Sequence, residues 1–113
     1  MNHKQIFADP GTVEWIQVDF LPGVQIMPFA QPAPEGSIHR TKLVAGTVIP
    51  AHTHPGDEYV LVLSGSIETG GRHCAVGTFW TTPARLRQGP HVAITDAELL
   101  TIRLGPLGLF DAT

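Results

Sequence analysis

The sequence predicts an all-β protein, and three observations lead to this fold class. The chain of 113 residues contains 12 glycines and 10 prolines, which separate short segments rich in β-branched and other apolar residues. Several of these segments alternate between apolar and polar residues with the two-residue period of a strand. No window longer than about ten residues has the period of a helix. Together these features favour a small closed or sandwich-like barrel of roughly ten short strands.

Length and composition indicate one soluble domain. The chain is long enough to bury a core, and its net charge of −3 includes no basic stripe, so nucleic acid is not expected as a partner. No apolar run is long enough to span a membrane, and the start of the chain lacks the apolar core of a signal peptide. One cysteine, Cys74, excludes an internal disulfide and suits a reducing compartment. We therefore expect a cytoplasmic protein, with Cys74 as a free buried thiol.

The expected strands lie between these turn signals. Residues 1–11 are expected to form an arm that ends in a turn at 9–11. A loop is predicted over 31–36, because its prolines cannot join a central strand. A second loop is predicted over 84–90, and a loose tail is expected to begin at Gly105. Strands are predicted at residues 12–19, 24–27, 37–44, 47–49, 59–63, 66–69, 72–76, 78–81, 91–94 and 99–104.

One of these strands, 59–63, is apolar on both of its faces. Such a strand is usually covered on both sides. The contents of the barrel would cover its inner face, and another sheet or a second subunit would cover its outer face.

The residues most suited to chemistry lie within 46–65. His52 and His54 are two residues apart at the end of an expected strand, so both imidazoles face the same way. Glu58 follows a short Pro-Gly turn, which brings a carboxylate back to the same end of the sheet. Two imidazoles and a carboxylate that converge on one point suit a first-row transition metal. Strand alternation places Asp57 opposite Glu58, so we expect Asp57 to point outward.

The same stretch resembles the first signature motif of the cupin superfamily. The fixed positions of that motif are all filled, by Gly46, His52, His54, Glu58 and Gly65.

The second cupin motif is present in part. Gly77 and Pro83 have the spacing of that motif, whereas Arg85 stands where a glycine is expected. The terminal asparagine is missing. The histidine of the motif arrives a few residues late, at His91, where a long loop would let it close the site from another strand.

Further likeness points to one branch of the superfamily. Trp15 with residues 21–24, and residues 89–91 after 79–80, are similar to a branch that groups cupin domains of anti-sigma factors with small dioxygenases. These dioxygenases cleave β-diketones or hydroxyacetophenones. The resemblance covers roughly residues 12–107.

The resemblance implies a fold, a metal and an assembly. The fold would be a conical β-barrel, or double-stranded β-helix of the jelly-roll type. Residues 1–113 would form a single cupin domain with a core at about 12–107, a flexible N-terminal arm and a flexible C-terminal tail, and the chain would form a homodimer. The ligands of one divalent metal inside the barrel would be His52, His54, Glu58 and His91.

The leading functional hypothesis is a mononuclear non-haem metal enzyme. Such a site leaves positions open for a bidentate oxygen substrate and O₂, or for polarising a carbonyl. We expect an Fe(II)-type dioxygenase that cleaves a C–C bond in a small diketone or hydroxyketone. Glu58 would either complete the ligand shell or accept a proton as a catalytic residue.

Two alternatives and the identity of the metal stay open. The chain could be a non-catalytic module that senses a small molecule or a metal, or a sugar isomerase-type cupin. Because the same ligands accept Fe, Mn, Ni, Zn or Cu, the donor set alone does not choose among these metals.

The other polar and aromatic residues have less specific interpretations. His3, His39 and His73 are interpreted as surface or strand-face histidines, of which His39 is the one that could point into the barrel. A solvated face or a dimer salt bridge is as consistent as substrate anchoring for Arg40, Lys42, Arg85 and Arg87. Core positions rather than a substrate platform are expected for Phe20, Phe29, Phe79 and Trp80.

Overall fold

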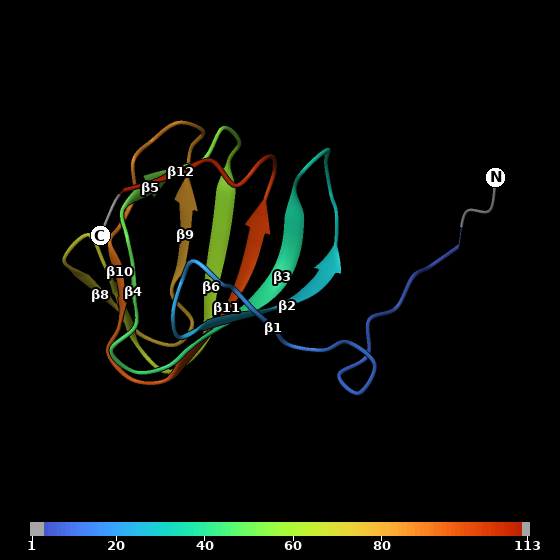
Figure 1. Cartoon of the computed structure of the whole chain (residues 1–113), viewed down its shortest axis with the longest axis horizontal. Helices are drawn as coiled ribbons and strands as arrows, with labels where there is room; N and C mark the ends of the chain where they lie inside the picture. Colours follow the sequence, from blue (N-terminus) through green and yellow to red (C-terminus); the bar gives the residue numbers. More distant parts are fainter. Residues whose placement is uncertain (1–3, 112–113) are drawn as a thin grey trace.

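A computed structural model describes residues 4–111, and all the regular elements in this range are β-strands (Figure 1). His3 lies outside the described residues. No helix among residues 4–111 has the length and apolar character needed to cross a membrane. The strands are β1 (Ile16–Gln17), β2 (Val24–Ala30), β3 (Ser37–Leu43), β4 (Val48–Ile49), β5 (His52–Thr53), β6 (Glu58–Ser64), β7 (Ile67–Thr69), β8 (Arg72–Cys74), β9 (Phe79–Thr82), β10 (His91–Ala93), β11 (Ala97–Arg103) and β12 (Leu109–Phe110).

The strands form two main antiparallel sheets and a short third one. The larger sheet has the order β1-β2-β3-β11-β6-β9, the second has the order β4-β10-β7-β8, and β12 pairs with β5. In Figure 1 the larger sheet fills the centre and right of the molecule, and β4, β10 and β8 lie on the left. Within residues 4–111 the strand pairing does not run continuously from one main sheet to the other. The predicted all-β fold of the jelly-roll type is confirmed, in its sandwich-like form.

The interior of the larger sheet has an apolar end and a polar end. Three alternate residues in each of β3, β6 and β11 are buried, as expected for strands that present one face to the core. At one end Leu43, Val62 and Leu99 pack in the hydrophobic core. Toward the other end the buried inward positions are polar, and they include His39 and Glu58. This polar end of the interior holds the candidate site.

The first strand is shorter than predicted. A strand is expected over 12–19, whereas β1 contains two residues, Ile16–Gln17. The Trp15 ring lies under two cations on the outer side of β3, with Arg40 Cζ 5.4 Å and Lys42 Nζ 4.9 Å from its centroid. Residues 4–15 do not pair in the sheet, because pairing begins at Ile16. Residues 4–9 have no regular structure and extend away from it (Figure 1).

The end of the described chain differs from its prediction. A loose tail is expected from Gly105, but β12 pairs with β5 in the register Leu109↔Thr53 and Phe110↔His52. Gly108 explains how the chain comes so close. Its φ is +89°, and a Cβ at this position would lie 2.1 Å from the carbonyl oxygen of Thr53. The pairing depends on a backbone approach that strand periodicity does not reveal.

Candidate metal centre

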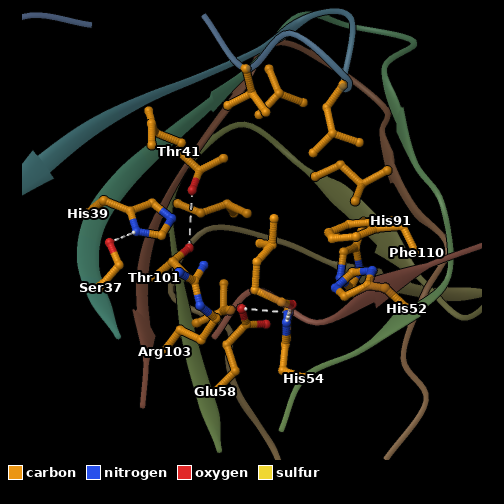
Figure 2. Close-up of a pocket in the computed structure, with 18 of the residues that line it drawn as sticks. Ser37, His39, Thr41, His52, His54, Glu58, His91, Thr101, Arg103 and Phe110 are labelled. Carbon is orange, nitrogen blue, oxygen red and sulfur yellow. Dashed lines mark hydrogen bonds and ion pairs between the residues drawn. The ribbon is translucent and has the colours of Figure 1, made fainter. Parts of the chain in front are cut away.

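Three of the four predicted ligands lie together at the polar end of the interior (Figure 2). The donor atoms that His52, His54 and Glu58 could offer to a metal all lie within 4.8 Å of one another, and the three residues are buried. Glu58 Oε2 is 3.2 Å from His54 Nε2. The ring centroids of His52 and His54 are 4.7 Å apart. The structure thus brings together the two imidazoles and the carboxylate that the sequence pattern groups.

His91 reaches the same cavity from β10 but lies slightly apart from this cluster. It is buried, and its ring centroid is 5.2 Å from that of His52. Its nitrogens are not among the donor atoms that cluster within 4.8 Å. The role of His91 as the fourth ligand therefore stays a prediction. Asp57 lies outside the cluster, where one of its carboxylate oxygens accepts a hydrogen bond from the backbone N–H of Ala84.

The imidazole rings are oriented for metal binding. Each of the three histidines uses Nδ1 in a hydrogen bond, so Nε2 is left to face the cavity. The carbonyl partner of His52 can only accept, which places the proton of this ring on Nδ1 and leaves Nε2 as a lone-pair donor. Nε2 of His54 faces Glu58 Oε2. The donor set thus fits a metal ion. The partners of Nδ1 are the Pro50 carbonyl oxygen at 2.7 Å for His52, the Leu107 carbonyl oxygen for His54, and the Thr69 hydroxyl at 2.7 Å for His91.

Glu58 is held in place by a residue that the sequence analysis did not single out. Gln88 Nε2 donates to Glu58 Oε1 at 3.0 Å, and Gln88 Oε1 accepts from the Thr82 hydroxyl at 3.2 Å. The backbone of Gln88 exchanges two hydrogen bonds of 2.9 Å with His52. Gln88 therefore ties the loop before His91 to both the carboxylate and the first histidine. No motif marks this glutamine, so only the folded loop reveals it.

The loop that departs from the second cupin motif keeps the backbone conformation that a glycine would favour. Arg85 has a φ of +67°, in the left-handed region. Its backbone N–H donates to the carbonyl oxygen of His54 at 2.8 Å. The chain thus has a left-handed turn beside the candidate ligands even though arginine stands where the motif has glycine.

Burial sets the charge of the site. Desolvation lowers the pKa of His52, and it lowers the pKa of His91 to about 4. Burial acts to raise the pKa of Glu58, but His54 and the hydrogen bond from Gln88 outweigh it, so the pKa of Glu58 is lowered. Near neutral pH the imidazoles of His52 and His91 are therefore neutral, and the carboxylate of Glu58 is ionised. These are the protonation states that a metal requires of its ligands.

The cluster opens into a cavity of about 270 Å³, close to the lower limit of about 300 Å³ for typical ligand pockets. Its wall also includes His39, Arg103 and Phe110, which Figure 2 labels around the candidate ligands. The interpretation of His39 as a surface or strand-face histidine is corrected by the structure. His39 is 6% exposed and lies in the interior, which was the other option for this residue. Arg103 and Phe110 were missed. Arg103 continues the inward alternation of Leu99 and Thr101 along β11, which was the available signal.

The basic residues proposed as substrate anchors lie elsewhere. Arg40 pairs with Glu98, and Arg87 pairs with Asp111. None of Arg40, Lys42, Arg85 and Arg87 is among the residues that line the cavity. Cys74 is free and buried, as predicted. Trp80 and Phe20 line the cavity. The core positions predicted for Phe20 and Phe79 are wrong, because both rings are largely exposed, Phe79 on the outside of β9.

An all-β sandwich with a buried His-His-Glu cluster at one end defines a cupin with a possible metal site. The family described as the ChrR cupin-like domain matches residues 3–108, and the chain belongs to this family. No curated protein matches the chain.

Solved structures share the fold at low sequence identity. An RmlC-like cupin from Ralstonia eutropha has a TM-score of 0.80 and 19% identity, over 96% of this chain and 78% of its own. An acetylacetone dioxygenase from Acinetobacter johnsonii has a TM-score of 0.76 and 12% identity, over 99% of this chain and 85% of the dioxygenase chain. A chain in the Rhodobacter sphaeroides complex of SigE with the anti-sigma ChrR has a TM-score of 0.71 and 22% identity, over 84% of this chain and 51% of its own length. At these identities the likeness shows the cupin fold.

Proposed function

We propose that the chain is a metal-dependent dioxygenase that acts on a small diketone or hydroxyketone. The ligands of one divalent transition metal per chain would be His52, His54, Glu58 and His91. One observation carries the proposal. A buried His-His-Glu cluster, with each imidazole oriented through Nδ1, opens directly into a mostly apolar cavity of about 270 Å³. The fold likeness to an acetylacetone dioxygenase supports the choice of reaction.

The residues around the site have separate tasks in this proposal. A bound divalent metal would supply Lewis acidity toward the oxygens of the substrate and a site for O₂. Apolar residues such as Val60 and Leu99 line the wall and would exclude water from the bound substrate. Glu58 is ionised and faces the cavity. In the alternative in which Glu58 does not complete the ligand shell, it is placed to accept a proton from the acidic carbon between two carbonyl groups.

An oxygen electrode tests this function. Protein loaded with Fe(II) under anaerobic conditions is expected to consume O₂ when pentane-2,4-dione, other β-diketones or hydroxyacetophenones are added. His52→Ala protein treated in the same way is the control and is expected to show no uptake. A loaded wild-type protein that consumes no O₂ with any member of this panel would contradict the proposal.

A second candidate is a non-catalytic sensing module. The observation that favours it is the match to the ChrR cupin-like family, together with the fold likeness to the anti-sigma ChrR. In this case metal-loaded protein would bind a small molecule in the cavity and return it unchanged after exposure to O₂. Recovery of the bound molecule by mass spectrometry separates the two candidates.

We also propose that the chain works as a homodimer in the cytoplasm. Tyr59 and Phe79 stack on the outer face of β6 and β9, with ring centroids 6.3 Å apart. Phe79 is 56% exposed and Leu63 is 40% exposed on the same face. A second copy would cover these apolar side chains. Sedimentation velocity is expected to give a dimer for the wild type and a monomer for Phe79→Glu, and a monomeric wild type would contradict the assembly.

A further inference from the structure

A second group of polar side chains lies beside the candidate metal site, on the far side of Glu58 from His54 (Figure 2). These side chains come from the inward positions of β3 and β11. Arg103 on β11 is paired in register with Ser37 on β3 and with Glu58 on β6. One step along the interior, Thr101 is opposite His39. This group, made of Ser37, His39, Thr101 and Arg103, lines the same cavity as the histidine ligands.

Arg103 carries a positive charge, and the carboxylate of Glu58 acts on it only from a distance. It is half-buried, and burial lowers its pKa, yet a guanidinium stays protonated at neutral pH. Its Nε donates to the carbonyl oxygen of Gly105 at 2.9 Å, which fixes the direction of the side chain. Among residues 4–111 no carboxylate forms an ion pair with Arg103. A charge that is withdrawn from water without a partner is costly, so its retention suggests an anionic ligand.

The charge of Glu58 acts to raise the pKa of Arg103, but Glu58 makes no direct ion pair with it. Oε1 of Glu58 accepts from Gln88, and Oε2 faces His54. Both oxygens are therefore engaged on the metal side of the residue. Within residues 4–111 the side-chain hydrogen bond of Arg103 is made by Nε, so its two terminal nitrogens can bind a group that enters the cavity.

His39 adds a neutral hydrogen-bonding group to the wall beside Arg103. Its Nδ1 is 2.7 Å from the hydroxyl of Ser37. Burial and the charge of Arg103 lower the pKa of His39 to about 4, so the ring is neutral at pH 7. When Ser37 donates to Nδ1, the proton of the ring sits on Nε2. His39 can then donate this N–H to an oxygen that Arg103 also binds.

We propose that Arg103 and His39 form a carboxylate-binding subsite, and that the substrate is a small organic acid. Its diketone or hydroxyketone oxygens would face the metal, and its carboxylate would bind the guanidinium. The planar fork of arginine matches a carboxylate in geometry as well as charge. One cavity of about 270 Å³ reaches both groups, so one small molecule can occupy them together. The metal-facing half of this inference rests on the proposed function, whereas the carboxylate half rests on Arg103 and His39.

Two matched diketones test the subsite. The acid is 4,6-dioxoheptanoate, whose carboxylate is two methylene groups away from the diketone. The neutral probe is heptane-2,4-dione, in which a methyl group replaces the carboxylate. Calorimetric titration of metal-loaded protein without O₂ is expected to give about 10- to 100-fold tighter binding of the acid, the size of a charge-assisted hydrogen-bond pair. Equal affinity for both probes would overturn the proposal, and this comparison needs no variant.

Three variants assign the preference to Arg103. Arg103→Met is expected to bind the acid as weakly as the neutral probe, with its affinity for heptane-2,4-dione and for the metal unchanged. Arg103→Lys is expected to restore part of the preference, because the charge returns without the fork. Arg72→Met removes the same charge from the exposed side of β8 and is expected to behave as the wild type. Arg103→Met protein that keeps the acid preference, or that loses metal affinity, would overturn the subsite.

The two proposals fail in different ways. If wild-type protein binds no metal or consumes no O₂ but still prefers the acid through Arg103, the dioxygenase proposal fails and the subsite stands. If metal-loaded protein consumes O₂ with heptane-2,4-dione and shows no preference for the acid, the subsite fails and the dioxygenase proposal stands.

Discussion

Phe110 stacks on the imidazole ring of His52, with ring centroids 4.5 Å apart and ring planes 20° from parallel. Phe110 belongs to β12, and its partner in the strand register is His52 itself. The ring of Phe20 packs edge-on against Phe110, with ring centroids 5.4 Å apart. The last strand of the described chain is therefore a wall of the candidate metal site, and it packs against the ring of a candidate ligand.

Removing the Phe110 ring is expected to destabilise the fold. Phe110→Ala deletes a half-buried ring and its stacking on His52, which we expect to lower the free energy of unfolding by about 1–2 kcal/mol. The neighbouring Leu109 is 78% exposed, so Leu109→Ala is the control and is expected to change it by less than about 0.5 kcal/mol. Denaturant unfolding measures both values. Equal effects for the two variants would show that the stacking contributes little.

The hydroxyl of Thr69 is expected to support metal binding through His91. Thr69→Val keeps the shape of the side chain but removes the hydrogen bond to Nδ1 of His91. Loss of such a partner lowers metal affinity by about 10- to 100-fold when the histidine is a ligand. Competition with a chelator measures the affinity, and Thr81→Val on the exposed side of β9 is the control. An unchanged affinity in Thr69→Val would argue against His91 as a ligand.

His39 is expected to make the metal-free protein less stable in mild acid. Burial, and then the charge of Arg103, lower the pKa of His39 from 6.5 to about 4. Between these values the unfolded chain binds a proton that the folded chain does not, so the free energy of unfolding falls as the pH drops. The slope is about 1.4 kcal/mol per pH unit for one such group. Buried His91 adds to the same loss.

A substitution isolates the share of His39. Between pH 7 and pH 5, His39→Asn protein is expected to lose about 1–2 kcal/mol less stability than the wild type. His73→Asn, on the exposed side of β8, is expected to follow the wild type. Urea unfolding of metal-free protein at the two pH values provides the comparison. A His39→Asn protein as sensitive to pH as the wild type would place the acid sensitivity elsewhere.

Local sequence was sufficient for the metal cluster. His52 and His54 are related by the two-residue period of an extended chain, and Glu58 returns after a short turn, so one stretch contains all three donors. The strand register did not have to be known. The existence of β3, β6 and β11 was also accessible to periodicity, because these strands have seven residues each.

The rest of the site depends on pairing between distant segments. Arg103 and Phe110 meet Glu58 and His52 through the β11–β6 and β12–β5 registers, and no local pattern determines those registers. A two-residue strand such as β12 has no period to detect. His39 lies in a correctly predicted strand, but its face was assigned wrongly. A histidine between polar neighbours does not show which side of the strand is buried.

Metal content tests the central claim most directly. Wild-type protein loaded with Fe(II) or Zn(II) and then freed of excess metal is expected to retain one ion per chain in elemental analysis. His52→Ala protein is expected to retain none, because it loses a donor from a buried cluster of three, while His73→Ala is expected to match the wild type. A wild-type protein that retains no metal would contradict the account, as would stoichiometric metal in His52→Ala.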